Sequence, residues 1–230
     1  MFRCKELKIF DRDKKLVDIN FNIDKSLALV GESGSGKSLT LKSILGLTPK
    51  NLEVDFKYES SFKLKNGESL SFVPQNPFTS LSPLTKIKNQ FLLSDSIAKR
   101  NLSLVGLDSS LLDRFPSELS GGQLQRVIIA MSLNPKVELI LLDEPTTALD
   151  LENKRNILKL LKKLMLDLNF KILFVTHDID SIETLCEDII VLYRGDIVES
   201  GKTIDILQNP QTKYAKNLID SNFSKRGFRE

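Results

Sequence analysis

Cysteine and histidine are scarce in this sequence. Its 230 residues include two cysteines, Cys4 and Cys186, and one histidine, His177. The two cysteines do not form a metal-spaced pair, and one histidine cannot build a multi-histidine metal site within the chain. Two isolated thiols do not make a disulfide framework. Their scarcity excludes a disulfide-stapled domain and fits a reducing cytosol.

Long hydrophobic runs are also missing. The longest, such as residues 139–142, are far shorter than the roughly 20 residues that span a bilayer. The N-terminal stretch MFRCKELKIF alternates and carries charge, without the apolar core of a signal peptide. We therefore expect no transmembrane segment, and a protein that does not cross a membrane by itself.

A strong charge of either sign is missing as well. The chain has 33 Lys and Arg against 30 Asp and Glu, a net charge of +3, which gives no strong case for nucleic-acid binding. Its hydrophobic content of 41% and charged content of 27% are those of an ordinary globular protein. The length fits one large domain, or one core with a smaller appendage.

Hydrophobic periodicity predicts the order of strands and helices. From residue 138 onward strands alternate with helices, which favours a parallel sheet covered by helices on both faces. Residues 84–134 are helical in period, with breaks at Gly106 and Pro116, and we interpret them as a mainly helical insertion. The predicted strands are 3–10, 15–23, 26–30, 138–143, 171–176, 188–193 and 196–199, with irregular strands in 52–73, and further helices cover 39–45, 151–168 and 179–186.

Residues 31–38, GESGSGKS, fit the pattern G-x-x-x-x-G-K-[ST] between a predicted strand and a predicted helix. The glycines let backbone N–H groups curl around a β-phosphate. Lys37 can reach the β- and γ-phosphates, and the Ser38 hydroxyl can bind Mg²⁺. The alternative is a glycine-rich turn without a ligand, but the lysine and serine in this context favour a phosphate site.

Ligands of open parallel sheets collect at the carboxyl ends of strands, here expected at Val30, Leu142 and Val175. After Leu142 come Asp143, placed to hold Mg²⁺, and Glu144, which could polarise an attacking water. Two acids at a strand end are often only solvated loop residues. Their place after a P-loop motif favours a role in the chemistry.

Three further features could contact a phosphate, its attacking water or Mg²⁺. His177 could contact a γ-phosphate or hold the attacking water, although a single histidine is usually a surface or core residue. Gln75 follows a short strand, and its carboxamide could join the Mg²⁺ shell. In SELSGGQLQR, residues 117–126, Ser120, Gly121 and Gly122 open a helix whose free N–H groups are a natural seat for an anion.

The order of motifs resembles the ATP-binding subunits of ABC transporters over nearly the whole chain. These motifs are GESGSGKS, Gln75, LSGGQ at 119–123, LILLDEP at 139–145, TALD at 147–150 and TH at 176–177. The resemblance implies an α/β fold, a P-loop NTPase of the ABC type, with a parallel core sheet, an antiparallel β subdomain and an inserted helical subdomain. It implies one domain over 1–230, with the helical subdomain at about 84–134 and short C-terminal helices and a tail at 203–230.

The resemblance also implies that two such chains pair head to tail around ATP and Mg²⁺. Each ATP lies on the P-loop of one subunit and under the LSGGQ of the other. The resemblance implies that Glu144, His177 and Gln75 are catalytic, that Ser38, Gln75 and Asp143 bind Mg²⁺, and that Asp150 lies in a loop linking the two sites. It implies that the partner's ATP is contacted by the signature residues Ser120, Gly121, Gly122 and Gln123. The nucleotide-binding residues that it implies are Gly31, Glu32, Ser33, Gly34, Ser35, Gly36, Lys37, Ser38 and Leu39, with Phe10 either stacked on adenine or packed in the β subdomain.

Finer motifs resemble the peptide and nickel importer ATPases. They are QNPFTSLSP at 75–83, RGDIVESG at 194–201 and NPQTKYAKNL at 209–218. The longer peptide-type subunits continue into a cysteine-bearing extension, and this chain has no cysteine after Cys186. Short nickel-type subunits therefore fit as well as peptide-type ones, and the expected function is ATP-driven uptake of nickel, dipeptide or oligopeptide.

The expected partners are a second ABC ATPase subunit (a copy or a paralogue), separate transmembrane permease subunits and, indirectly, a substrate-binding protein, with no nucleic acid. The expected location is peripheral, at the cytoplasmic face of the inner or plasma membrane. One alternative is a soluble ABC-type ATPase of DNA repair or regulation, although the long coiled-coil insertions of such repair proteins are missing here. The other is a non-hydrolysing partner subunit, against which Glu144, Gln75, His177 and the intact LSGGQ argue.

Overall fold

The computed structural model describes residues 1–147 and 149–223, without the side chains of residues 222 and 223. The chain divides into two compact units, Met1–Lys63 with Lys171–Glu230 and Leu64–Phe170, and each is described by itself. Ala148 of the TALD motif and residues 224–230 of the predicted tail lie outside the described residues.

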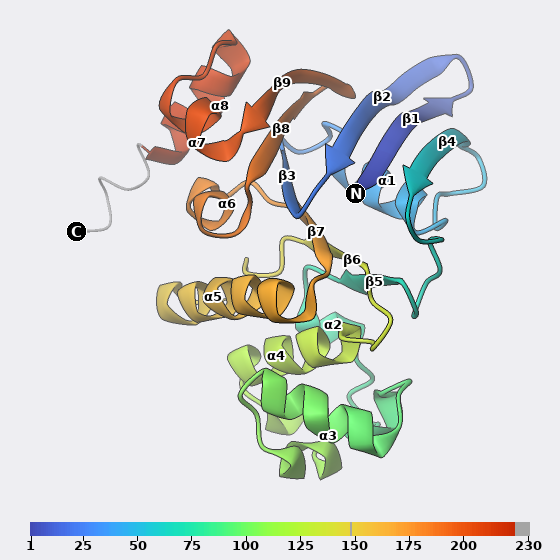
Figure 1. The fold of residues 1–230 in the computed structure, drawn as a ribbon, viewed down its shortest axis with the longest axis vertical. Helices are drawn as coiled ribbons and strands as arrows, with labels where there is room; N and C mark the ends of the chain where they lie inside the picture. The colour runs from blue at the N-terminus through green and yellow to red at the C-terminus, as the bar shows by residue number, and fades with distance from the viewer. Residues whose placement is uncertain (148, 224–230) are drawn as a thin grey trace. The chain divides into compact units, whose positions relative to one another are not determined.

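The first unit contains a mixed β-sheet with the strand order β4-β1-β2-β9-β8-β3-β7 (Figure 1). Strand β1 pairs antiparallel with β2 and β4, whereas β3 pairs parallel with β7 and β8. The strands are β1 (Phe2–Asp11), β2 (Lys14–Ile23), β3 (Ser26–Val30), β4 (Glu53–Ser60), β7 (Lys171–Val175), β8 (Asp188–Tyr193) and β9 (Asp196–Lys202).

Burial in these strands follows their side-chain patterns. Strand β1 buries Cys4, Leu7 and Ile9 between more exposed residues, as a strand with one covered face does. All five residues of β3 are buried, which explains why its sequence is a short apolar run. Cys4 and Cys186 are free buried thiols, and burial raises the pKa of Cys4 to about 12.

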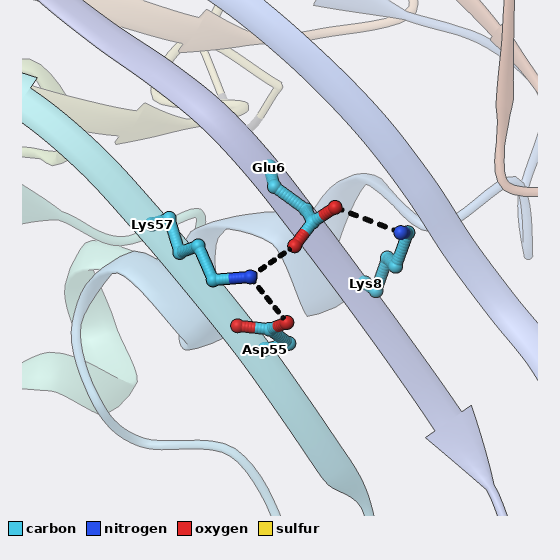
Figure 2. A network of polar contacts seen from close by, with 4 residues as sticks. All are labelled: Glu6, Lys8, Asp55 and Lys57. Carbon is cyan, nitrogen blue, oxygen red and sulfur yellow. Dashed lines mark hydrogen bonds and ion pairs between the residues drawn. The ribbon is translucent and has the colours of Figure 1, made fainter.

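A polar network joins β1 to β4 on their exposed side (Figure 2). Lys57 Nζ donates to Glu6 Oε1 at 2.6 Å and to Asp55 Oδ2 at 3.0 Å, and Lys8 Nζ donates to Glu6 Oε2 at 2.7 Å. The hydrogen bonds from Lys57 and Lys8 lower the pKa of the Glu6 carboxyl to about 2. Glu6 lies where the register of β1 shifts, so the network supports a charge-matched pairing at this irregularity.

Four helices of the first unit connect or follow its strands. They are α1 (Lys37–Ile44), α6 (Ile179–Leu185), α7 (Thr203–Gln208) and α8 (Lys213–Phe223). Helix α1 begins directly after the loop that leaves β3, and α6 follows β7 in the same way. Helices α7 and α8 come after the last strand, β9 (Figure 1).

The second unit combines a parallel strand pair with helices. Strand β5 (Leu70–Val73) pairs with β6 (Leu139–Asp143). Buried Asn101 of α3 donates from Nδ2 to the carbonyl oxygens of Ala130 and Leu133 at 3.0 and 2.6 Å, which ties α3 to the end of α4. The helices are α2 (Pro77–Ser80), α3 (Asp95–Leu104), α4 (Gly121–Ser132) and α5 (Leu151–Leu168), with 3-10 helices η1 (Ile87–Gln90), η2 (Ser109–Asp113) and η3 (Pro116–Glu118).

The predicted strands and helices are confirmed to within a few residues, with two differences. Strand β9 continues to Lys202, beyond the predicted end at 199, because its backbone pairing with β8 extends to Asp188 although its last residues are exposed. Helix α2 is not predicted, since it is one turn that begins at Pro77 after the capping residue Asn76. Within the described part of the chain no helix is long and apolar enough to cross a membrane.

Candidate functional site

The loop between β3 and α1 wraps around the side chain of Lys37. Lys37 is buried, and its Nζ donates to the carbonyl oxygens of Gly31 and Glu32 at 2.7 and 2.8 Å. Ser38 follows on the exposed side of α1. The loop thus places an ammonium group and the first N–H groups of a helix together, which is an arrangement that attracts a phosphate.

The conformation of this loop requires a glycine at its end. Gly36 is the residue before α1 and has φ +111°, where a Cβ would also lie 2.7 Å from Val17 Cγ2. The neighbouring Ser35 is buried, and its Oγ has no hydrogen-bond partner among the described residues. A tight backbone curl with a polar atom left over inside it fits a polar ligand such as a phosphate.

The carboxyl ends of β3, β7 and β8 meet at one edge of the first unit's sheet. Leu29 is level with Val175 of β7, and Val30 is level with Val191 of β8. The exposed His177 follows β7 at this edge. Two of the strand ends named from the sequence therefore lie side by side, and the end of β8 is a third that the sequence analysis did not single out.

The second unit brings Gln75 and Glu144 together. Gln75 Nε2 and Thr147 Oγ1 each donate to Glu144 Oε2 at 3.1 Å. The parallel register of β5 and β6 produces this contact, because Val73 is level with Leu142 and both residues follow the strand ends. The oxygen of the Gln75 amide, which is the atom that Mg²⁺ prefers, is not used in this contact.

Glu144 has a backbone conformation that is unusual for a residue with a side chain. Its φ is +45°, in the left-handed region. Backbone strain of this kind persists where the surrounding structure demands it and is frequent at functional sites. The half-buried Asp143 precedes it as the last residue of β6. The sequence predicts that these two carboxylates follow the strand, but it does not predict the left-handed backbone conformation of Glu144.

The LSGGQ stretch begins α4 with a capping box. Ser120 Oγ accepts from the N–H of Gln123 at 3.3 Å, and Gln123 Oε1 accepts from the N–H of Ser120 at 2.9 Å. Ser120 is exposed and keeps its own hydroxyl proton as a donor. The N–H groups of Gly121 and Gly122 lie in the first turn, where no preceding helical carbonyl is available to them.

Asp150 caps the neighbouring helix, α5. Its carboxylate accepts from the N–H of Asn153 at 3.0 Å and from Asn153 Nδ2 at 2.5 Å. The hydrogen bond from the Asn153 N–H lowers the pKa of Asp150. A Cβ on Gly122 would lie 3.0 Å from Asn153 Oδ1, so the start of α5 approaches the start of α4. Asp150 therefore has a structural role here besides the interface role that the resemblance implies.

The other residues predicted for the nucleotide site lie on β1, on α1 and in the loop between β3 and α1. Phe10 is half-buried near the end of β1 and pairs with Lys15 and Glu53 of the adjacent strands. Leu39 is half-buried in α1. Glu32, Ser33 and Gly34 form the exposed tip of the loop.

Tyr214 is a site residue that the sequence analysis missed. Its hydroxyl oxygen accepts from the N–H of Glu32 in the loop at 2.9 Å. The available signal was its place in the NPQTKYAKNL stretch, which resembles a recurring family motif without indicating any contact.

Comparisons with known proteins agree with this arrangement. A protein-family model described as ABC transporter matches residues 15–147. The oligopeptide transport ATP-binding protein OppD of Bacillus subtilis is 36% identical over 88% of this chain and 65% of its own length. The dipeptide transport ATP-binding protein DppD of Lactococcus lactis is 33% identical over 90% of this chain and 68% of its own length. The chain thus spans about two thirds of these relatives.

A solved structure shares the fold. It is a dimeric ATP-binding cassette in a post-hydrolysis state with ADP and Pi, 28% identical to this chain, with a TM-score of 0.70 over 88% of this chain and 99% of its own. The α/β fold class expected from the sequence, that of an ABC-type nucleotide-binding domain, is thereby confirmed.

Replacing Gly36 with alanine tests the loop conformation. At φ +111° and 2.7 Å from Val17, Gly36→Ala is expected to lower the free energy of unfolding by about 2–3 kcal/mol. Gly34→Ala is the matched control, because Gly34 has φ +80° and open space around its Cα, with an expected loss of about 1 kcal/mol. Urea unfolding without nucleotide measures both, and equal losses would contradict this account of the loop.

Proposed function

Because the chain belongs to the ABC transporter family, we propose that it is the ATP-binding and hydrolysing subunit of an importer. The observation that carries the proposal is the loop of residues 31–36, whose carbonyl groups hold the Lys37 ammonium at the start of α1. In this proposal residues 31–39 bind the phosphates of ATP. The backbone N–H groups and Lys37 supply the positive potential for a polyphosphate.

The residues proposed for Mg²⁺ fit that ion by their chemistry. Ser38, Gln75 and Asp143 offer a hydroxyl, an amide oxygen and a carboxylate, which are the hard oxygen ligands that Mg²⁺ prefers. When bound, Mg²⁺ would neutralise charge on the phosphates.

Glu144 is proposed to orient and activate the water that attacks the γ-phosphate. The hydrogen bonds from Gln75 and Thr147 fix one of its carboxylate oxygens, so the carboxylate is held in place to receive a water. His177 is proposed to contact the γ-phosphate and the same water. Since phosphoryl transfer needs little covalent chemistry from the protein, positioning by these groups supplies most of the catalysis.

The signature residues Ser120–Gln123 are proposed to act on the ATP of a second subunit. The start of α4 has the hydroxyl and N–H donors that a γ-phosphate accepts, and its helix dipole favours an anion. A site shared by two chains makes pairing depend on the terminal phosphate, which ADP lacks. The partner is a copy of this chain or a paralogue, and Asp150 lies in the loop proposed to link the two sites.

We further propose that residues 1–230 act as one ATPase domain. Its helical subdomain covers about 84–134, and its C-terminal helices and tail cover 203–230. In this proposal the chain binds transmembrane permease subunits peripherally at the cytoplasmic face of the membrane, and a substrate-binding protein delivers the cargo to them. The intact LSGGQ and the Gln75–Glu144 contact support an ATP-hydrolysing subunit over a partner subunit that does not hydrolyse ATP.

The proposed cargo is a peptide. The relatives that match over most of the chain carry the names of oligopeptide and dipeptide transport proteins, and the residues 75–83 fit both peptide and nickel subunits. Peptide is therefore the better supported of the two cargo classes that the sequence left open.

Glu144→Gln tests the assignment of the catalytic carboxylate. An amide has nearly the same shape but cannot take a proton from water, so ATP hydrolysis is expected to fall at least about 100-fold. ATP binding is retained, and ATP holds the variant as a dimer in size-exclusion chromatography. The exposed Glu152→Gln serves as control and should hydrolyse ATP at the wild-type rate. Hydrolysis by Glu144→Gln at the parent rate would show that the assignment is wrong.

The cargo proposal is tested in the complete transporter. The chain is purified with the permease subunits that it binds and with their substrate-binding protein, and ATP hydrolysis is measured after addition of short peptides or of Ni²⁺. The expected result is stimulation by peptide and none by Ni²⁺. The reverse pattern would replace peptide with nickel, without changing the ATPase assignment.

A further inference from the structure

The helix α8 reaches back to the loop that surrounds Lys37. Tyr214, in the first turn of α8, accepts a hydrogen bond through its hydroxyl oxygen from the N–H of Glu32 at 2.9 Å. Both residues belong to the first unit. The stretch around Tyr214 resembles a motif of the importer ATPases but has no part in the proposed reaction. The contact of Tyr214 with Glu32 therefore needs a separate explanation.

The Glu32 N–H and the Gly31 carbonyl belong to one planar peptide group. The two point in opposite directions across a trans peptide, so a partner on one side constrains the other. On the N–H side the partner is the Tyr214 hydroxyl, and on the carbonyl side it is Lys37 Nζ at 2.7 Å. The phenol and the ammonium group thus hold the same peptide plane from its two sides.

Tyr214 is itself held firmly. Its ring lies 4.4 Å from the ring of Tyr193, the last residue of β8, at an interplanar angle of 44°. The guanidinium of Arg194 also lies over the Tyr193 ring, 5.1 Å from its centroid. Burial raises the pKa of the Tyr214 hydroxyl above its ordinary value.

Glu199 of β9 anchors the start of α8. One carboxylate oxygen accepts from the N–H of Gln211 at 2.8 Å, and the other accepts from the N–H and Oγ1 of Thr212 at 3.0 and 2.9 Å. Burial alone would raise the pKa of Glu199, but the N–H groups of Gln211 and Thr212 outweigh it and lower the pKa. The carboxylate therefore fixes the turn just before Tyr214.

The loop has a second tie at its other end. The N–H of Gly195, in the turn between β8 and β9, donates to the Ser35 carbonyl oxygen at 3.0 Å. The β8–β9 hairpin thus holds the loop at Ser35, and α8 holds it at Glu32. Between these points lie the exposed residues Ser33 and Gly34.

We propose that Tyr214 is a positioning residue for nucleotide binding, and this rests on the proposed ATP-binding function of the loop. Its hydroxyl presets the Gly31–Glu32 peptide and, through it, the carbonyl that orients Lys37 toward the phosphates. A preset loop loses less conformational freedom when ATP binds. Tyr214 touches neither phosphate nor water in this role, so it acts on binding rather than on the chemical step.

Tyr214→Phe removes the hydroxyl and keeps the ring beside Tyr193. The loss of one hydrogen bond is expected to raise the Kd and KM for ATP about two- to tenfold and to leave kcat nearly unchanged. Isothermal titration calorimetry and steady-state ATP hydrolysis measure the two effects. Tyr58→Phe, on β4 between aromatic neighbours, is the matched control and should keep the wild-type affinity.

The second variant is Glu199→Ala, which releases the start of α8. It is expected to raise the Kd for ATP in the wild-type background and to add nothing in the Tyr214→Phe background, because both act on the same peptide. Additive effects, or a Tyr214→Phe variant that binds ATP like the wild type, would overturn the proposal. If the wild-type chain itself does not bind ATP, the proposed function fails instead.

Discussion

The loop around the Lys37 ammonium is the constraint on which the candidate site of the first unit depends. A buried charge needs polar partners, and the carbonyl oxygens of Gly31 and Glu32 supply them at 2.7 and 2.8 Å. They can do so only if the backbone curls, and the curl is possible because Gly36 adopts φ +111°. Glycine-rich curls direct backbone N–H groups toward an anion in phosphate-binding loops, so the conformation that satisfies the lysine is also the one proposed to bind phosphate.

Regular structure brings the other groups to their places. In the first unit the parallel register of β3, β7 and β8 sets the loop, His177 and the Gly195 turn at one edge of the sheet. In the second unit the register of β5 and β6 sets Gln75 beside Glu144. Each polar group thus follows a buried strand, so the core fixes its position while its side chain stays accessible to a ligand.

The sequence predicts what is encoded in a few consecutive residues. The P-loop, the LSGGQ cap and the apolar run before Asp143 are local patterns, and the structure confirms the strands and helices that carry them. Contacts between distant segments have no such pattern: the hydrogen bond of Tyr214 to Glu32 spans 182 residues. The positive φ of Glu144 also escapes prediction, because a glutamate rarely adopts it and nothing in the residue type signals it. Helix α2 is too short to show a period.

The central claim is that this loop binds the phosphates of ATP through Lys37. Calorimetric titration of the purified chain with MgATP tests it most directly, with Lys37→Ala compared to Lys42→Ala, which removes the same charge from the exposed face of the same helix. Wild type and Lys42→Ala should bind ATP alike, and Lys37→Ala should weaken binding at least about tenfold, because a charge-assisted contact to phosphate is lost. Equal affinity of Lys37→Ala and Lys42→Ala would contradict the account.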